Sequence, residues 1–252
     1  EEFKIPGFVA LVTNSEENIY SKAFGLANVS RGEPMQVDSI FQIASMTKPI
    51  TSAGLMILVQ QGLVELDDNI SDHINNLPAF EIFDQVNLDS GTFSTKIAKN
   101  PITIRQLFTH TSGLAYNFNS FELAATNQPL FNSERYLLQH EPGEKWTYGP
   151  STNLLGEIIE ERSGLGLFEY MQEKLFIPLS MEETFFEVPD SKLTRVVTRH
   201  AKVGDNLQLQ KYIFSFDKIE QVEESNYNSL KAYFLMKKDG KLIDTFTPEI
   251  RF

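Results

Sequence analysis

The chain has 252 residues, of which 41% are hydrophobic, and this is enough for one large domain, or two closely packed ones, with a substantial core. Its net charge of −12, without a run rich in Lys or Arg, argues against nucleic acid or an anionic membrane surface as the partner. The absence of cysteine excludes a disulfide, a thiolate nucleophile and a Cys-ligated zinc. The four histidines show no metal-site spacing, so we expect no metal.

The first predicted elements are two strands, residues 8–12 and 18–24, on either side of a turn at residues 14–17. The first strand is a continuous apolar run (FVALV), and the second (NIYSKAF) mixes apolar and polar side chains. Glycines and a proline between residues 25 and 34 then mark a loop. This loop leads into the first helix.

The segment FQIASMTKPITSAGLMILVQQG, residues 41–62, predicts a helix that begins close to Ser45. Only two side chains between residues 50 and 59 are polar, and a helix that is apolar all round is a buried one. Gly62 stands where a left-handed C-cap would end the helix. Ser45 and Lys48 lie one turn apart on the same face, so this polar pair either caps the helix or takes part in chemistry.

The middle of the chain predicts helices and loops. Thr103 and Gln106 have the spacing of a capping box that opens a short helix. Residues 133–140 (SERYLLQH) predict another helix, with Ser133 as its N-cap. Further helices are expected over the apolar stripe at residues 154–159, which stops at Gly164, and over residues 168–175.

Beyond residue 195 the hydrophobic pattern weakens, and the strongest signal is a hairpin over residues 232–246 around Asp239-Gly240. Two strands, a long helical middle and further strands predict an α/β (α+β) fold, with an antiparallel sheet flanked by helices and an inserted helical subdomain. We expect one domain over residues 1–252. Its sheet-containing part takes residues 1–44 and 166–252, and its helical part takes residues 45–165 and carries the Ser45 helix.

Three features of the middle region carry chemistry: the Ser45/Lys48 pair, the segment His110-Thr-Ser-Gly113, and Tyr148 in WTYGPSTN. A serine hydroxyl is a poor nucleophile until a base takes its proton. A helix N-terminus supplies partial positive charge, and a partly buried lysine can lose its proton and act as that base. The phenol of Tyr148 could hydrogen-bond both partners. A Ser-x-x-Lys pair alone is common, and an N-cap serine beside a solvated lysine is the alternative interpretation.

Five segments follow one another along the chain: IPGFVALV, DSIFQIASMTKPITSAGLMILVQQGLVELDD, ITIRQLFTHTSGLAY, EPGEKWTYGPSTNLLGEIIEERSG and LFIPLSMEETFF. In this order they resemble the motifs of the serine β-lactamase-like family, over about residues 5–188. The family includes class C β-lactamases, penicillin-binding D-alanyl-D-alanine carboxypeptidases and related serine esterases. The resemblance implies a β-lactamase/transpeptidase-like fold.

By this resemblance Ser45 is the nucleophile, Lys48 is its activating partner, and Tyr148 is the general base that later returns a proton to the leaving group. The backbone amide of Ser45 would form one half of an oxyanion hole. No metal or cofactor is needed, because the nucleophile and the proton carriers are all side chains. His110 is expected to order its turn by hydrogen bonding. Trp146 is either a core or loop anchor or, because it is close to Tyr148, part of the substrate pocket, and Pro150 is the second candidate for a substrate contact.

Two departures from the family pattern bear on function. In penicillin-binding proteins and class C enzymes the tyrosine motif reads Tyr-x-Asn, but here the third position is Pro150, as in the esterase branch. The family's third motif, a Lys-Thr-Gly-type tripeptide, is absent, and the nearest string, Lys238-Asp-Gly240, falls in the predicted hairpin turn. We therefore expect the chain to be a C-terminally truncated fragment with an incomplete sheet, whose own activity is open.

The leading hypothesis is a serine hydrolase that acts through an acyl-enzyme on carboxylic esters. The alternatives are a β-lactamase or D-alanyl-D-alanine carboxypeptidase, separated from an esterase by Pro150, and a non-catalytic binding member of the same fold. The expected partner is a small-molecule ester, β-lactam or short peptide, with no nucleic acid and no membrane segment in this chain. The compartment and the oligomeric state stay open.

Overall fold

The computed structural model describes residues 5–126, 128, 135–199, 206–209, 212–223, 228–238, 241–246 and 249–251. The chain divides into two compact units, one made of residues 1–41 with 190–252 and the other of residues 42–189. Every candidate site residue named above lies in the second unit. The expected organisation as one catalytic domain stays a prediction.

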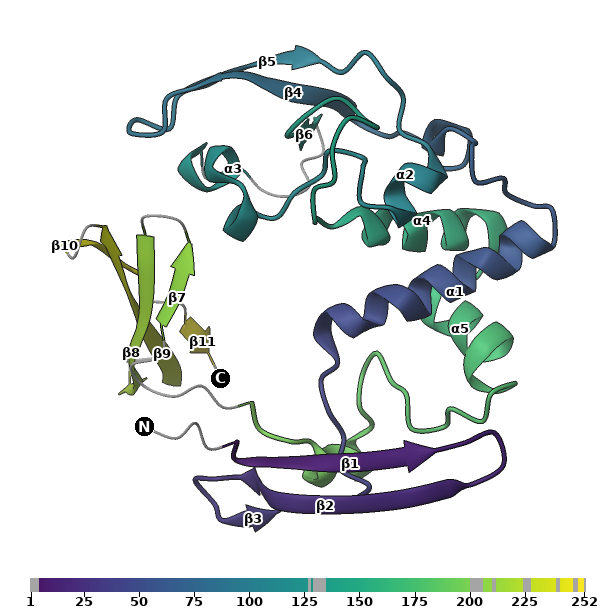
Figure 1. The fold of residues 1–252 in the computed structure, drawn as a ribbon, viewed down its shortest axis with the longest axis vertical. Helices are drawn as coiled ribbons and strands as arrows, with labels where there is room; N and C mark the ends of the chain where they lie inside the picture. Colours follow the sequence, from purple (N-terminus) through teal and green to yellow (C-terminus); the bar gives the residue numbers. More distant parts are fainter. Residues whose placement is uncertain are drawn as a thin grey trace. The chain divides into compact units, whose positions relative to one another are not determined.

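The first unit begins with the predicted strand pair (Figure 1). Strands β1 (Gly7–Thr13) and β2 (Asn18–Asn28) are antiparallel, and β3 (Glu33–Pro34) pairs with the end of β2. The turn forms because the side-chain oxygen of Asn14 accepts hydrogen bonds from two backbone amides that follow it. The N-terminal hairpin is therefore confirmed.

The second sheet of this unit is antiparallel throughout, in the order β10-β9-β8-β7, with β11 also pairing with β9. Its strands are β7 (Asn206–Leu209), β8 (Tyr212–Glu223), β9 (Asn228–Lys238), β10 (Lys241–Phe246) and β11 (Glu249–Arg251). The hairpin expected over residues 232–246 is confirmed, since Lys238 pairs with Lys241. Its turn residues, Asp239 and Gly240, lie outside the described residues.

The second unit starts with a 3₁₀ turn, Ala44–Met46, followed by α1 (Thr47–Gln60), so the helix begins where the sequence predicts. Gly62 has a φ of 69°, and the amides of Gly62 and Leu63 donate to the carbonyls of Val59 and Leu58. This is a Schellman motif, and it confirms the predicted left-handed end.

Helix α1 packs against α4 (Ser151–Ser163) and α5 (Leu167–Met171), and a π-helical turn, Gln172–Phe176, continues α5. Contact is close at Gly54, where a Cβ atom would lie 2.5 Å from the sulfur of Met171. The Tyr170 hydroxyl also donates to the Gly54 carbonyl at 3.1 Å. These contacts fix the middle of α1 against α5, and Gly164 (φ 71°) ends α4 as predicted.

The prediction that α1 is buried on all sides is wrong. Thr51, Gly54, Leu55 and Leu58 are buried, but the side chain of Met56 is 42% exposed. The hydrophobic composition of a helix does not determine how many neighbouring elements pack against it. Here α4 and α5 cover one face of α1, and Met56 is on a part of the helix that they leave exposed.

A third sheet, in the order β5-β4-β6, completes the second unit. Strand β4 (Ala79–Val86) is antiparallel to β5 (Phe93–Ile97) and parallel to β6 (Arg135–Leu138). The helix predicted over residues 133–140 is therefore wrong, and Ser133 lies outside the described residues. The periodicity of a short apolar run does not distinguish a strand from a helix. Residues 135–138 form a strand because their backbone pairs with that of β4.

The remaining helices are short. Helix α2 (Ile104–Phe108) starts at the predicted capping box: Gln106 donates its backbone amide to the Thr103 hydroxyl, and Thr103 donates its own to the Gln106 side chain. Helix α3 spans Phe121–Thr126, and 3₁₀ turns lie at Ile70–Asp72, Asn117–Asn119 and Asp190–Arg195. In the described part of the chain, no helix has the length and apolarity needed to cross a membrane.

Candidate active site

Ser45 lies in the 3₁₀ turn directly ahead of α1, with an exposed side chain. Its hydroxyl accepts a long hydrogen bond, 3.4 Å, from Lys48 Nζ, one turn further along. The preceding residue, Ala44, has a φ of 45°, a region that costs a residue with a Cβ about 1–3 kcal/mol. Such strain persists only where the surrounding structure holds the backbone in place.

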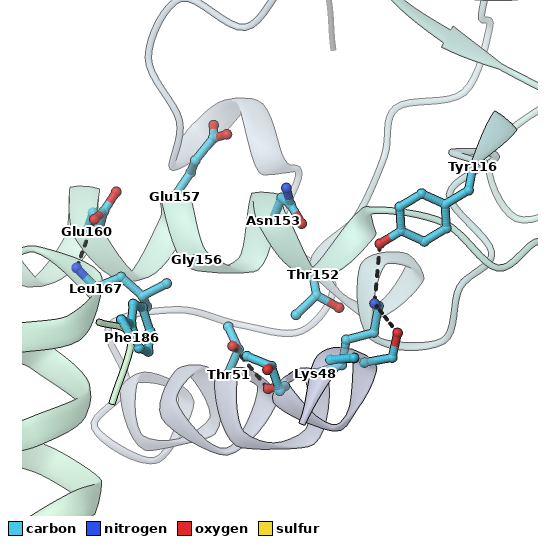
Figure 2. Close-up of a pocket in the computed structure, with 13 residues that line it drawn as sticks. Lys48, Thr51, Tyr116, Thr152, Asn153, Gly156, Glu157, Glu160, Leu167 and Phe186 are labelled. Atoms are coloured by element: carbon cyan, nitrogen blue, oxygen red, sulfur yellow. Dashed lines mark hydrogen bonds between the residues drawn. The ribbon is translucent and has the colours of Figure 1, made fainter. Parts of the chain in front are cut away.

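The ammonium group of Lys48 lies among three hydroxyl-bearing side chains. It donates a hydrogen bond to the Ser45 hydroxyl. It also donates, at 3.3 Å, to the hydroxyl of Tyr116, as Figure 2 shows. It also lies 4.9 Å from the ring centroid of Tyr148. The structure therefore brings together Ser45, Lys48 and Tyr148, the three residues predicted to be catalytic.

Tyr116 is the member of this cluster that sequence reasoning did not single out. The signal for it was present, because it is the last residue of the segment HTSGLAY. A second phenol close to the lysine gives the site another proton donor and acceptor.

The electrostatics of the cluster favour a charged lysine. Partial burial acts to lower the pKa of Lys48, but hydrogen bonds to Tyr148 and Tyr116 outweigh it, and the pKa lies above its ordinary value of 10.5. Hydrogen bonds from Ser45 and Lys48 lower the pKa of the Tyr148 phenol below its ordinary value of 10.0. These directions count against a neutral Lys48 acting as the base and favour Tyr148 as the proton acceptor.

Tyr116 and Tyr148 lie on two segments that are far apart in the sequence, and hydrogen bonds hold these two segments side by side. The amide of Thr147 donates to the carbonyl of His110 at 2.7 Å, and the fully buried hydroxyls of Ser112 and Ser151 lie 2.9 Å apart. At Gly149 a Cβ atom would run into the backbone of the neighbouring segment, so a glycine is needed there for this close approach. The two loops are packed backbone against backbone.

His110 was expected to order its turn by hydrogen bonding, and for its side chain this stays a prediction, since the buried Nδ1 atom of the imidazole has no hydrogen-bond partner among the described residues. Its carbonyl accepts the Thr147 amide, its φ is 54°, and its ring contacts those of Trp146 and Tyr148. Burial first, and then the charge of Lys48, lower the pKa of His110 below its ordinary value of 6.5. The imidazole is therefore neutral at neutral pH.

Trp146 and Pro150 were predicted to contact substrate. The Trp146 side chain is 66% exposed and stacks on Tyr148 with centroids 6.3 Å apart. Pro150 is buried, and its carbonyl accepts the amide of Asn153 at the start of α4. A substrate-binding role for either residue stays a prediction.

A cavity of about 590 Å³ opens beside the cluster, between α1 and α4. Figure 2 shows Lys48 and Thr51 on α1 and, opposite them, Thr152 on α4 with its side chain pointing toward α1. The volume lies in the range of small-molecule sites. Its lining includes Ser45, Lys48, Thr51, Tyr116, Asn153 and Glu157. No sequence motif predicted that Asn153 and Glu157 line a cavity.

The described ranges contain no group of three or more His, Cys, Asp or Glu side chains that could hold a metal ion. The polar groups of Ser45, Lys48 and the two tyrosines lie close enough to exchange protons, and a serine hydroxyl becomes a nucleophile when a neighbouring base takes its proton.

The family model described as Beta-lactamase matches residues 1–217, more than half of the chain. The chain belongs to the beta-lactamase family. This confirms the family and the β-lactamase/transpeptidase-like fold that the motif order implied. A second family model, the CcmF C-terminal beta-sandwich, matches residues 193–252, which is too small a share of the chain to show a family.

The relatives to which the chain is similar include an acyltransferase and an esterase. It is 28% identical to a monacolin J acid methylbutanoyltransferase of Aspergillus terreus, over 99% of this chain and 67% of the relative. It is 32% identical to a lovastatin esterase of Penicillium rubens, over 73% of this chain and 49% of the relative. The solved structure of simvastatin synthase (LovD) from Aspergillus terreus matches with a TM-score of 0.61 and 29% identity, over 70% of this chain and 47% of that one. The chain thus spans about half to two thirds of these relatives.

Proposed function

We propose that this protein is a serine hydrolase that forms an acyl-enzyme on Ser45 and acts on carboxylic esters. The observation that carries the proposal is the position of the Lys48 ammonium group, 3.4 Å from the Ser45 hydroxyl and 3.3 Å from that of Tyr116, beside a Tyr148 phenol of lowered pKa. A non-catalytic binding member of the family would have no need of this arrangement.

In the proposed mechanism Ser45 Oγ attacks the ester carbonyl carbon, and its proton passes to the phenolate of Tyr148. The Lys48 ammonium stabilises the phenolate beforehand. When the carbon–oxygen bond to the alcohol breaks, Tyr148 returns the proton to the departing oxygen. A water molecule then gives a proton to Tyr148 and attacks the acyl-serine. When the bond between the acyl carbon and Ser45 Oγ breaks, Tyr148 passes this proton to Ser45 Oγ, the acid is released, and the serine hydroxyl and the phenolate are restored. The Ser45 amide as one oxyanion donor stays part of this proposal.

The choice of esters rests on Pro150 and on the relatives, whose names include an esterase and a methylbutanoyltransferase. Proline offers no amide to a substrate side chain, and a buried polar group left without a partner costs about 1–3 kcal/mol. This cost falls on β-lactams and D-Ala-D-Ala peptides, whose side-chain amides need a partner. Short acyl esters carry no such group.

We therefore expect the full-length protein to have a kcat/KM for a p-nitrophenyl short-chain ester at least about tenfold above that for a chromogenic cephalosporin. Equal or better cephalosporin turnover would overturn the esterase assignment. Pro150→Asn is a direct probe, because asparagine is also a good N-cap for α4 and should fold. The ratio should then move toward the cephalosporin.

Adding a primary alcohol to the same ester assay separates hydrolysis from acyl transfer. The transferase names of the relatives favour a second function in which an alcohol replaces water as the acceptor. An ester of the added alcohol among the products would establish that function. Free acid as the sole product would leave hydrolysis alone.

The proposed proton transfers predict a bell-shaped pH profile for kcat/KM. Activity should rise with pH as Tyr148 loses its proton, with a midpoint below 10.0, and fall again as Lys48 loses its proton above 10.5. The rising limb should persist in His110→Asn, because the pKa of His110 lies below 6.5, and should be lost in Tyr148→Phe. The reverse pattern would assign the base to His110.

A further inference from the structure

Asn119 connects the two tyrosine-bearing segments through both ends of its side-chain amide. Its Nδ2 group donates to the carbonyl oxygen of Tyr148 at 2.7 Å. Its Oδ1 atom accepts the backbone amide of Tyr116 at 3.1 Å, and its own backbone amide donates to the Tyr116 carbonyl, also at 3.1 Å. One side chain therefore contacts the main chain of both tyrosines that surround Lys48.

We propose that Asn119 is a positioning residue that holds the Tyr148 and Tyr116 phenols in place around Lys48. This inference rests on the proposed acyl-enzyme function. The chemistry of the side chain is specific, because the two contacts need one donor and one acceptor at neighbouring positions, which a primary amide supplies. Aspartate would keep the acceptor for Tyr116 but would place an oxygen against the Tyr148 carbonyl.

The surroundings separate this role from a structural one. The segments are already fastened by the buried Ser112–Ser151 pair and by the Thr147–His110 hydrogen bond, whereas Asn119 is exposed. Exposed side chains away from the core contribute little to the free energy of unfolding. Loss of Asn119 should therefore leave the fold intact and release the Tyr148 end of the loop.

Release of Tyr148 should be visible in the pH dependence of activity. The titratable groups that face the Tyr148 phenol are Lys48, from α1, and Tyr116 and His110, from the segment that carries Asn119. Lys48 is the cation among these described groups. If the Tyr148 phenol moves away from the Lys48 ammonium group, the phenolate is less stabilised and the pKa of Tyr148 rises. The rising limb of kcat/KM should then move to higher pH.

The experiment compares three variants of the full-length protein in ester hydrolysis. Asn119→Asp removes the donor and adds a charge, and Asn119→Ala removes both contacts without a charge. Asn117→Asp is the matched control, since it makes the same change two residues away, at a side chain whose hydrogen bond goes to the Gln128 carbonyl. We expect kcat to fall about tenfold in Asn119→Asp and about threefold in Asn119→Ala, with KM little changed and the rising limb displaced upward in both.

The outcomes distinguish the two proposals. If the unmodified protein forms no acyl adduct on Ser45, the proposed function itself fails. If it forms the adduct but both Asn119 variants keep its kcat and pH profile, the positioning role alone is wrong. An equal displacement in Asn117→Asp would also overturn it, because a general charge effect would then explain the result. Loss of folding in both Asn119 variants would make the residue structural and would contradict the inference.

Discussion

Replacing Ser45 with alanine is expected to lower ester hydrolysis by about 10³-fold or more, because it removes the hydroxyl that forms the acyl-enzyme in the proposed function. In the structure the Ser45 hydroxyl accepts a hydrogen bond from Lys48 Nζ, and Ser45 is among the residues that line the cavity. The unmodified full-length protein treated with a fluorophosphonate should gain the mass of one adduct on the peptide that contains residues 42–48. Peptide mass spectrometry and steady-state kinetics measure the two effects.

The matched control is Ser52→Ala, the same chemical change further along α1 at a half-buried serine. This variant should retain its adduct and its activity. An adduct on a different serine, together with turnover by Ser45→Ala, would show that the nucleophile has been misassigned.

Lys48→Ala is expected to lower kcat/KM by about 10²- to 10⁴-fold, the range that general acid–base catalysis supplies. The ammonium group donates to Ser45 and Tyr116 and helps to lower the pKa of Tyr148. Without it the phenolate loses its cation, so the residual activity should require a higher pH than that of the unmodified protein. A pH–rate profile of the variant measures both effects.

Lys22→Ala provides the comparison, since Lys22 also lies over a tyrosine ring, that of Tyr20, but in the first unit of the chain. It should behave as the unmodified protein does. If Lys48→Ala keeps a tenth or more of the activity, the ammonium group is not part of the proton-transfer machinery.

Local sequence signals determined much of the fold. The β1–β2 hairpin follows from its turn, α1 begins and ends where Ser45 and Gly62 place it, and α2 starts at its capping box. Each of these features depends on residues within a few positions of one another, whose backbone preferences act before any tertiary contact forms. The same holds for the proximity of Ser45 and Lys48, which one helical turn is enough to produce.

The tertiary structure decided the features that need a distant partner. Strand β6 is a strand because it pairs with β4, and α1 buries one face because α4 and α5 cover that face. Tyr116 and Asn119 belong to the candidate site because their segment packs against the one that carries Tyr148. A short-range sequence pattern cannot predict these contacts, because burial and strand pairing depend on which distant surfaces meet when the chain folds.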